Sequence, residues 1–377
     1  MDFNLSEEQE TFKKAARDFL AERLSKAEVR KMEESDTGYS PEIWKEMAGL
    51  GWMGMVFPEK YGGRGKGFLH LAVLLEEMGR ACLPGPYFST VVLGGFSIMD
   101  AASEKQKQEY LPKIAGGEII LTLALTEANA KYKATSVKVR ASSERDEFTI
   151  NGTKLFVADA HIADYLICVV RTGDEVKAAD GISLFIVDTT KPGINTTVLK
   201  TVANDKLCEV TFNQTKVPRE NVLGEVGLAW NNVEKIVERA ALAKCCEMLG
   251  GLQAVFDMTI DYAKNRVQFG RPIGSFQIIQ HYCANMAIDI DCSRLSIYKA
   301  AWLMSEGLPC TKEIAIAKSW TSQAYRRTIA LAHQIHGAIG LSLDYDLHFY
   351  TRRARAAETS FGDIDFYQEI LAGEMNF

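Results

Sequence analysis

The period of the hydrophobic pattern changes twice along this chain of 377 residues, and the two changes constrain the fold more than any other feature. Apolar residues recur at helical spacing over about 1–117, alternate over about 118–227, and return to helical spacing over about 228–377. A chain of this length exceeds what one small core needs, so we expect several packed units. The sequence therefore predicts an α+β fold with an N-terminal helical domain, a middle β-barrel or sandwich domain and a C-terminal four-helix bundle.

The first segment is predicted to be helical. Ser6 stands before three glutamates and a run of apolar residues at helical spacing, which indicates a capped helix start. Further helices are expected at 41–44 and at 69–78. The glycine-rich stretch 58–65 between them is expected to be a loop.

The middle segment carries strand patterns. Val137, Val139 and Ala141 alternate with polar residues, which is typical of a half-buried strand. We expect 148–157 to form two strands around a turn at Asn151-Gly152. Other strands are expected at 165–170, 182–187 and 207–212.

Long helical patterns fill the last segment. They cover 233–267, 276–306 and 312–336, and a shorter pattern follows Tyr345. Four such helices can pack antiparallel around one core, which gives the predicted bundle.

Composition excludes some classes of function. The formal net charge of −6 gives no overall attraction to nucleic acid or to an acidic membrane, and no apolar run reaches the length of a membrane span. The N-terminus has acidic residues and no apolar signal core, and the eight cysteines form no CxxC pair. We therefore expect a cytoplasmic protein with reduced thiols and without a metal site.

Several local sequences, taken together, are similar to those of one family. The segments are Leu123-Ala-Leu-Thr-Glu127, Asn151-Gly-Thr-Lys-Leu-Phe-Val157, 216–224 at the end of the β segment, 262–277 and Gln334-Ile-His-Gly-Ala-Ile-Gly340. Their order and their helix–strand–helix context resemble the acyl-CoA dehydrogenase family over nearly the whole chain. The resemblance implies an FAD-dependent dehydrogenase that oxidises an acyl-CoA thioester between its α and β carbons and passes electrons to an electron-transfer flavoprotein.

The resemblance also implies where FAD binds. A flavin needs an apolar slot for its ring, hydrogen-bond donors for its electron-rich edge and cations for its pyrophosphate. The main chain near Leu125 and Thr126 would bond the pyrimidine part, and Phe156 and Val157 would pack against the ring. The residues implied to hold the ADP part of a neighbouring subunit's flavin are Arg266, Phe269, Gln277, Gln334 and Gly337.

Each of these residues also has a purely structural interpretation. Arg266 alone is typical of an exposed arginine at a helix end, and Phe269 alone is typical of a core residue. Gln334 to Gly337 alone is typical of a helix C-terminus. The joint occurrence of the segments favours the functional interpretation.

The residue that removes the α proton is displaced in this chain. In much of the family a Glu before a Gly serves as this base, and here that position holds Phe361, before Gly362. A second group of relatives places the base on the first bundle helix, at a position that corresponds here to Ala240. Neither side chain can accept a proton, so either the base is another residue or this chain does not desaturate a substrate.

Three carboxylates remain as candidates for the base. Glu238 lies two residues before Ala240, about 200° away around a helix, and would need a shift of the helix near Gly250 to reach the same face. Glu247 follows Ala240 by seven residues, on the same face, and is the favoured candidate; its alternative is a structural ion pair. Asp363 adjoins the missing position, and its alternative is a loop-capping aspartate.

Two further departures leave two hypotheses open. The serine that often contacts CoA is absent, so Tyr132 is the candidate substrate contact, and Ala158 replaces a threonine that often faces the flavin. The first hypothesis is an active dehydrogenase for a bulky, branched or cyclic acyl-CoA. The second is a non-catalytic or half-catalytic subunit of a heteromeric dehydrogenase. Both imply a homotetramer or a heterotetramer with a related chain.

Overall fold

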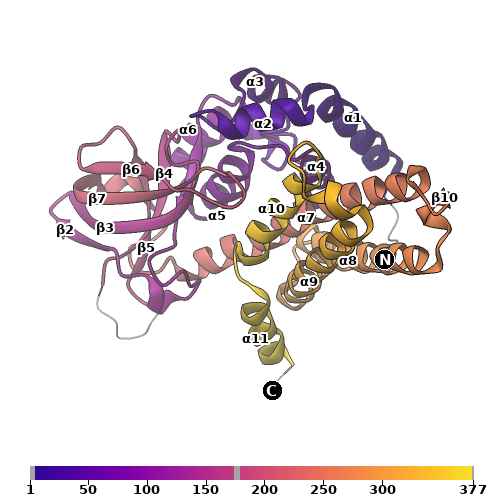
Figure 1. Ribbon diagram of the computed structural model, residues 1–377. Coiled ribbons are helices and arrows are strands. Elements are labelled where there is room, and N and C mark those ends of the chain that lie inside the picture. The colour runs from indigo at the N-terminus through magenta and orange to yellow at the C-terminus, as the bar shows by residue number, and fades with distance from the viewer. Residues whose placement is uncertain (1–4, 174–178, 376–377) are drawn as a thin grey trace. The chain divides into compact units, whose positions relative to one another are not determined.

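The computed structural model describes residues 5–173 and 179–375 (Figure 1). The chain divides into two compact units that alternate along the sequence. We call Met1–Arg30, Gly67–Leu83 and Ala241–Phe377 the bundle unit, and Lys31–Lys66 and Pro84–Ala240 the sheet unit. No helix of the described residues combines the length and apolar character that a bilayer crossing requires.

The bundle unit is built from long helices. They are α1 (Glu7–Arg23), α4 (Phe68–Ala81), α7 (Trp230–Asn265), which starts in the sheet unit, α8 (Gln277–Ser305), α9 (Thr311–His336), α10 (Leu347–Thr359) and α11 (Ile364–Glu374). A short hairpin of β9 (Val267–Gln268) and β10 (Arg271–Pro272) joins α7 to α8, and 3-10 turns η5 (Ile273–Ser275) and η6 (Gly337–Leu341) follow β10 and α9. The long helices predicted from the sequence are confirmed, whereas α11 was not predicted.

The first helix begins as its sequence indicates. The Ser6 hydroxyl accepts a hydrogen bond from the Gln9 amide at 3.2 Å, and the Gln9 side chain accepts one from the Ser6 amide at 2.9 Å. This reciprocal pair satisfies two amides that an uncapped helix end leaves open. The predicted helix start is confirmed, with Gln9 as the second member of the cap.

Two glycines let α4 and α7 cross at very short distance. A Cβ added to Gly79 would lie 2.0 Å from the carbonyl oxygen of Glu247, and one added to Gly250 would lie 1.7 Å from the carbonyl oxygen of Glu76. Real Cβ atoms do not approach backbone so closely, so each glycine is needed where the helices meet. Gly250 does not interrupt α7, which is α-helical from Trp230 to Asn265.

A buried carboxylate is neutralised near this crossing. The Glu76 side chain is 3% exposed, and its oxygens lie 2.9 Å from Lys13 Nζ and 2.7 Å from Arg294 Nη1. Tyr298 also donates its hydroxyl hydrogen to Glu76 at 2.6 Å. Burial alone would raise the pKa of Glu76, but the two cations and the hydrogen bonds outweigh it and lower that pKa.

The sheet unit combines short helices with one sheet. Its helices are α2 (Lys26–Glu34), which begins in the bundle unit, α3 (Pro41–Gly49), the π-helix η2 (Phe88–Gly95), α5 (Phe96–Ala101) and α6 (Glu104–Ala115), with 3-10 turns at Glu59–Tyr61, Ala134–Ser136 and Arg219–Asn221. Its strands are β1 (Leu121–Ala124), β2 (Arg140–Glu144), β3 (Glu147–Ala158), β4 (Tyr165–Arg171), β5 (Ile182–Asp188), β6 (Ile194–Val198), β7 (Leu207–Pro218) and β8 (Val222–Leu223).

The sheet is connected in the order β6-β7-β3-β2-β4-β5-β8, and β1 pairs in parallel with β4. β4 and β5 are buried along nearly their whole length, because both faces of these central strands are covered. The predicted fold class is confirmed: in the order of the chain, helical N- and C-terminal segments flank a middle segment that forms the sheet.

One predicted turn is wrong. Asn151 and Gly152 do not reverse the chain; they lie inside β3, where the pairing with β7 shifts by one residue between Ile150 and Gly152. The Asn151 side chain accepts a hydrogen bond from the Gln214 amide of β7 at 2.8 Å, so it spans the bulge instead of closing a turn. The hairpin turn is at Arg145-Asp146, where Glu144 pairs with Glu147.

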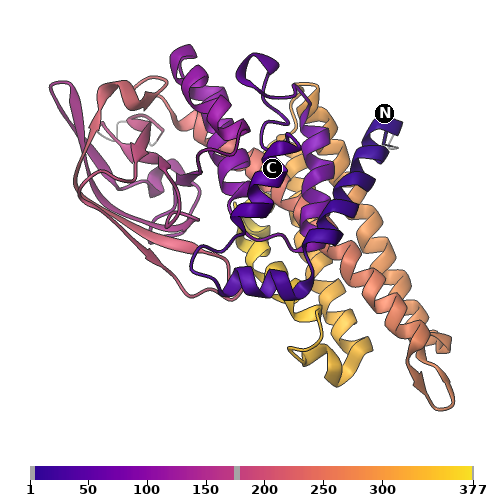
Figure 2. The same ribbon diagram turned by 90° about the horizontal axis from the view of Figure 1, so that it is seen from above.

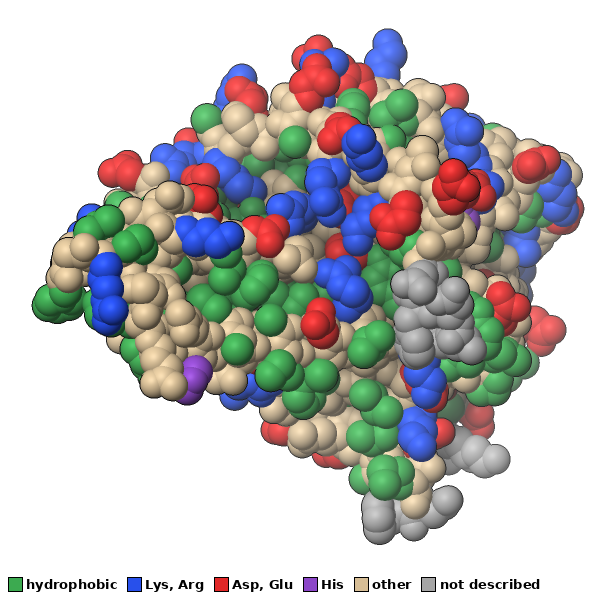
Figure 3. All heavy atoms as spheres, turned by 90° about the vertical axis from the view of Figure 1, so that its right-hand side faces the viewer, with side chains coloured by type: hydrophobic (Ala, Val, Ile, Leu, Met, Phe, Trp, Pro, Cys, Tyr) green, Lys and Arg blue, Asp and Glu red, His purple; other side chains and the backbone are tan. Residues whose placement is uncertain are grey.

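Charged side chains are mixed on the surface. On the face shown in Figure 3, basic and acidic side chains are interspersed and apolar side chains lie between them. The eight cysteines are free thiols, and five of them are buried. The described residues contain no group of histidine, cysteine and carboxylate side chains arranged to hold a metal ion.

Candidate active site and flavin-binding residues

The chain leaves the sheet at the end of β1. The next three residues, Leu125, Thr126 and Glu127, which we call the exit segment, are hydrogen-bonded to residues of β3. Lys154 Nζ donates to the Leu125 carbonyl oxygen at 3.0 Å, and the Leu155 amide donates to the Thr126 carbonyl oxygen at 2.9 Å. Glu127 accepts a hydrogen bond from Lys154 Nζ at 2.7 Å. The carbonyl groups of this exit segment therefore point toward β3.

The amide groups of the exit segment are free on its other side. Among the described residues, none accepts a hydrogen bond from the amide of Thr126 or of Glu127. In a planar trans peptide the N–H points opposite to the carbonyl of the preceding residue, so these two donors face away from β3. Two adjacent donors of this kind suit an electron-rich heterocycle edge.

Beside the exit segment, β3 bulges and presents an aromatic ring. The β3–β7 register shifts between Lys154 and Val157, and Phe156 within the bulge has φ +57°. Phe156 is 48% exposed, whereas Val157 is 1% exposed and belongs to the core. Of the two residues predicted to pack against a flavin ring, Phe156 is the one that offers free ring surface.

The hairpin after α7 projects beyond the ends of α7 and α8 (Figure 2). Its two turn residues, Phe269 and Gly270, have φ values of +53° and +76°, as a tight hairpin turn requires. Phe269 is 93% exposed, so the core interpretation of this residue is wrong. A phenylalanine in a strained conformation at an exposed tip is typical of a residue that binds something outside its own chain.

Arg266 lies at the base of this hairpin and is exposed. Its guanidinium makes no ion pair or hydrogen bond with the described residues, so it is available to an anion. Gln277, the first residue of α8, is also exposed. Arg271 lies over the Phe276 ring at 4.3 Å, and Phe276 meets Phe269 edge to face at 6.1 Å.

The structure brings the end of α9 to the end of α7. Tyr262 stacks on His336 with ring centroids 4.5 Å apart, and the Tyr345 hydroxyl lies 2.9 Å from His336 Nε2. Gln334 and Gly337 flank this cluster and are exposed, and Gly337 has φ +63°. Two segments about seventy residues apart in the sequence thus lie side by side within the bundle unit.

Of the candidates on α7, Glu247 differs from its neighbours. Ala240 and Ala241 are fully buried, and Cys245, Cys246 and Met248 are buried as well. The Glu247 side chain remains 24% exposed and pairs with Lys244, whose Nζ lies 2.5 Å from Oε2. In the described part of the chain, no group hydrogen-bonds Oε1 of Glu247, so this oxygen is free to accept a proton.

The helix shift that would bring Glu238 to the face of Ala240 is absent, because α7 is uninterrupted. Glu238 is half-buried, and its neighbour Arg239 pairs with Asp100 at 2.6 Å. Arg239 is therefore held by Asp100 of α5.

The segment after α10 makes a tight turn at the position of the missing base. Phe361 and Gly362 have φ values of +57° and +108°, and the Phe361 carbonyl accepts the Tyr367 hydroxyl hydrogen at 2.8 Å. Asp363 caps α11, since its carboxylate accepts the Phe366 amide hydrogen at 2.9 Å. The capping interpretation of Asp363 accounts for its place in the sequence.

The loop that carries Tyr132 is fixed by a buried arginine. Arg171 is 1% exposed and donates to the carbonyl oxygens of Ala134 at 2.8 Å and of Val137 at 3.2 Å. Tyr132 itself is half-buried. The loop is thus anchored at its C-terminal side, next to the candidate substrate contact.

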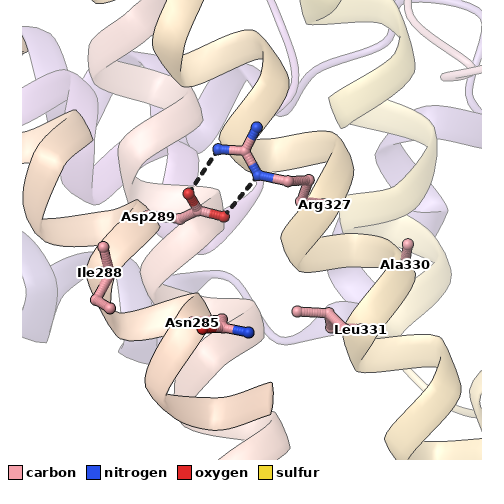
Figure 4. Close-up of a pocket in the computed structure, with 6 residues that line it drawn as sticks. All are labelled: Asn285, Ile288, Asp289, Arg327, Ala330 and Leu331. Carbon is pink, nitrogen blue, oxygen red and sulfur yellow. Dashed lines mark hydrogen bonds and ion pairs between the residues drawn. The ribbon is translucent and has the colours of Figure 1, made fainter. Parts of the chain in front are cut away.

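A separate hollow of about 460 Å³ lies between α8 and α9. Arg327 and Asp289 form a two-fold hydrogen-bonded pair across it, at 2.6 and 3.1 Å, and Asn285, Ile288, Ala330 and Leu331 complete the wall (Figure 4). None of the residues predicted from the sequence lines it.

The acyl-CoA dehydrogenase N-terminal, middle and C-terminal domain families match residues 6–118, 122–215 and 230–375. A probable acyl-CoA dehydrogenase, YngJ of Bacillus subtilis (strain 168), is 33% identical over 383 residues, which cover 100% of both chains. The chain belongs to the acyl-CoA dehydrogenase family. Members of this family are FAD-dependent oxidoreductases.

Two solved structures have the same fold. Butyryl-CoA dehydrogenase from Megasphaera elsdenii superposes with a TM-score of 0.92 at 30% identity and full coverage of both chains. A chain of the ChsE4-ChsE5 complex from Mycobacterium tuberculosis superposes with a TM-score of 0.90 at 25% identity, covering 100% of this chain and 99% of that one.

The described residues fit FAD in both units. In the sheet unit, two free amides follow Leu125 and the exposed Phe156 ring lies on the neighbouring strand. In the bundle unit, the exposed Arg266 lies at the base of the hairpin whose tip carries the exposed Phe269. These are the donors, ring surface and cation that a flavin dinucleotide requires, and the flavin when bound would accept a hydride from the substrate.

The pair of Lys154 and Glu127 was not predicted from the sequence. Lys154 lies an even number of residues after Phe148 and Ile150, which are buried, and alternate residues of a strand share a face. This spacing predicts that the charge of Lys154 is buried. A buried lysine needs a partner, and that requirement was the signal that could have identified the pair.

Proposed function

We propose that this acyl-CoA dehydrogenase desaturates an acyl-CoA thioester between its α and β carbons, with Glu247 as the base. The observation that carries the proposal is the single half-exposed carboxylate in an otherwise buried stretch of α7. Lys244 holds one of its oxygens and leaves the other open. A base positioned by one fixed hydrogen bond can meet a substrate proton without first having to reorient.

The acyl group is proposed to be bulky, branched or cyclic. Glu247 lies two helical turns beyond Ala240, which is about 10 Å along the helix axis. The position where the second group of relatives places the base holds the small, buried Ala240, and Ala241 after it is buried as well. A substrate whose reacting carbon reaches Glu247 would therefore differ in shape from one that is processed at the position of Phe361.

We further propose that the active form is an oligomer in which the hairpin of one subunit grips the flavin of its neighbour. Phe269 meets Phe276 but remains 93% exposed, and in the described part of the chain Arg266 makes no ion pair. Apolar residues also remain exposed along α8 and α9: Ile278, Ile288, Leu295, Ile316 and Trp320. An apolar surface of this kind supports a tetramer.

We also propose that the enzyme is cytoplasmic and that it passes its electrons to an electron-transfer flavoprotein.

A second candidate function is a half-catalytic subunit of a heteromeric dehydrogenase. The observation that favours it is Phe361, which holds the usual base position in a well-formed turn, together with Ala158 next to the flavin strand. The similarity to a chain of a two-component complex is compatible with this role.

The visible spectrum of the purified chain separates the two candidates. A yellow homo-oligomer that is bleached anaerobically by an acyl-CoA thioester supports the first. The thioesters for this assay are chosen by their stabilisation of the protein in a thermal-shift panel. A colourless chain that gains flavin only with a co-expressed relative would reject the first candidate and support the second.

A further inference from the structure

Lys154 is a buried lysine of β3 that contacts the exit segment. Its side chain is 0% exposed, and burial, only partly offset by Glu127, lowers its pKa. Its amine donates to the Leu125 carbonyl at 3.0 Å and to Glu127 at 2.7 Å. Burying a lysine costs free energy unless its amine is paired and hydrogen-bonded, so these contacts have to account for its presence.

Glu127 is itself fixed by the backbone. Its carboxylate accepts hydrogen bonds from the amides of Lys138 at 2.9 Å and Val139 at 3.1 Å, just before β2. The Lys154 amine is therefore clamped between a fixed carboxylate and the Leu125 carbonyl. Because the amine is fixed in place, the Leu125 carbonyl keeps this hydrogen bond only in one orientation of the Leu125–Thr126 peptide plane.

The fixed plane decides where the Thr126 amide points. The carbonyl of Leu125 is bound to Lys154, so the N–H of Thr126 faces the opposite side. The next peptide is oriented in the same sense by the Leu155 amide, which binds the Thr126 carbonyl. Lys154 and Leu155 are adjacent on β3, so one strand orients two successive donors and also carries Phe156.

We propose that Lys154, clamped by Glu127, is a positioning residue that aims the amides of Thr126 and Glu127 at the pyrimidine edge of the flavin. The proposal rests on the proposed function, since it needs FAD at this strand end. Donors fixed on this edge stabilise the negative charge that the pyrimidine part gains on reduction, so they raise the reduction potential of the flavin. Lys154 acts through the backbone and does not touch the flavin.

The test compares the flavin-loaded wild type with Lys154→Met, which removes the amine and keeps the length of the side chain. We expect the dissociation constant for FAD to rise about tenfold, as for the loss of one well-placed hydrogen bond. We also expect a lower midpoint potential and a shift of the visible flavin bands. A purely structural role would lower the melting temperature and leave the spectrum and potential of bound flavin unchanged.

Lys318→Met serves as the matched control. Lys318 is also a fully buried lysine that binds backbone carbonyls, but it lies in the bundle unit and binds those of Ala357 and Glu358, away from the exit segment and from the amides that hold Glu127. We expect this variant to lose thermal stability without a change in the potential of bound flavin. An equal change of potential in both variants would overturn the proposal.

Glu127→Gln decides the case if Lys154→Met does not fold. It keeps a side-chain oxygen for the Lys138 and Val139 amides and removes the charge that clamps Lys154, so its flavin changes should have the same sign and be smaller. Unchanged spectrum and potential in the folded variant would reject the positioning role while the wild type still binds flavin. A wild type that binds no flavin under any loading condition would instead reject the proposed function.

Discussion

Lys244 Nζ lies 2.5 Å from Oε2 of Glu247, one helical turn away on α7. This pair holds the proposed base by one oxygen only. We expect Glu247→Gln to retain bound flavin and to slow anaerobic bleaching by acyl-CoA more than about a hundredfold, the usual scale for a lost general base. Stopped-flow absorbance at the flavin band measures this rate.

Glu234→Gln, an exposed substitution on the same helix, is the control and should bleach at the wild-type rate. Bleaching of Glu247→Gln at nearly that rate would remove Glu247 from the reaction. If Glu238→Gln were the variant that lost bleaching, the base would have to be assigned to Glu238.

A glutamate placed at position 361 should compensate in part. Phe361 already adopts φ +57°, so Phe361→Glu introduces no new backbone strain, and it supplies a carboxylate where much of the family has one. In the Glu247→Gln background we expect at least about a tenfold recovery of bleaching. Phe361→Gln in the same background is the matched control, and equal recovery with glutamine would show that the carboxylate is not the cause.

The hairpin tip is expected to bind flavin without stabilising its own subunit. Phe269 is 93% exposed, so Phe269→Ala should change the melting temperature of the flavin-free protein very little. The flavin content of the purified oligomer should fall, because the removed ring is proposed to contact the neighbour's cofactor. Leu308→Ala, which removes an exposed side chain of the same unit, should leave flavin content intact; equal losses would contradict the prediction.

Glu76 should contribute stability that depends on pH. Glu76→Gln leaves Lys13 and Arg294 without their shared countercharge, and we expect a loss of about 3–5 kcal/mol at pH 7. The folded-state pKa of Glu76 lies below its ordinary value of 4.5, so this stability is present above pH 4.5 and is lost as the pH falls through the folded-state pKa.

The wild type and Glu76→Gln should therefore converge in unfolding free energy as the pH falls through the folded-state pKa of Glu76. Urea unfolding of both proteins between pH 3 and pH 7 provides the comparison, and only the difference between them is assigned to Glu76. A difference that stays constant over this range would show that the charge of Glu76 is not what stabilises the bundle unit.

Gly250→Ala should separate α4 from α7. The new Cβ would overlap the Glu76 carbonyl at 1.7 Å, and rigid backbone cannot yield as a side chain does. We expect a loss of about 1–3 kcal/mol or more in unfolding free energy. Gly373→Ala in α11 meets no atom within 4 Å and should be neutral or stabilising, so a similar loss there would point to a cause other than the overlap.

The sequence predicted the helices well because their signals are local. Ser6 and Gln9 cap α1 by a bond between residues three apart, and the long apolar stripes of α7, α8 and α9 follow from spacing alone. The Asn151-Gly152 turn was predicted from equally local chemistry and was wrong, since the Asn151 side chain binds Gln214 on another strand. The sequence of a dipeptide does not predict a hydrogen-bond partner that lies sixty-three residues away.

The amino-acid order by itself determined the succession of helical and strand segments, the family and the absence of a carboxylate at position 361, because each depends on residue type and local spacing. Only the tertiary structure decided that Phe269 is exposed and that Lys154 binds the Leu125 carbonyl. These properties depend on which residues far apart in the sequence come into contact and which side chains stay exposed. Tertiary packing decides both, and it involves the whole chain at once.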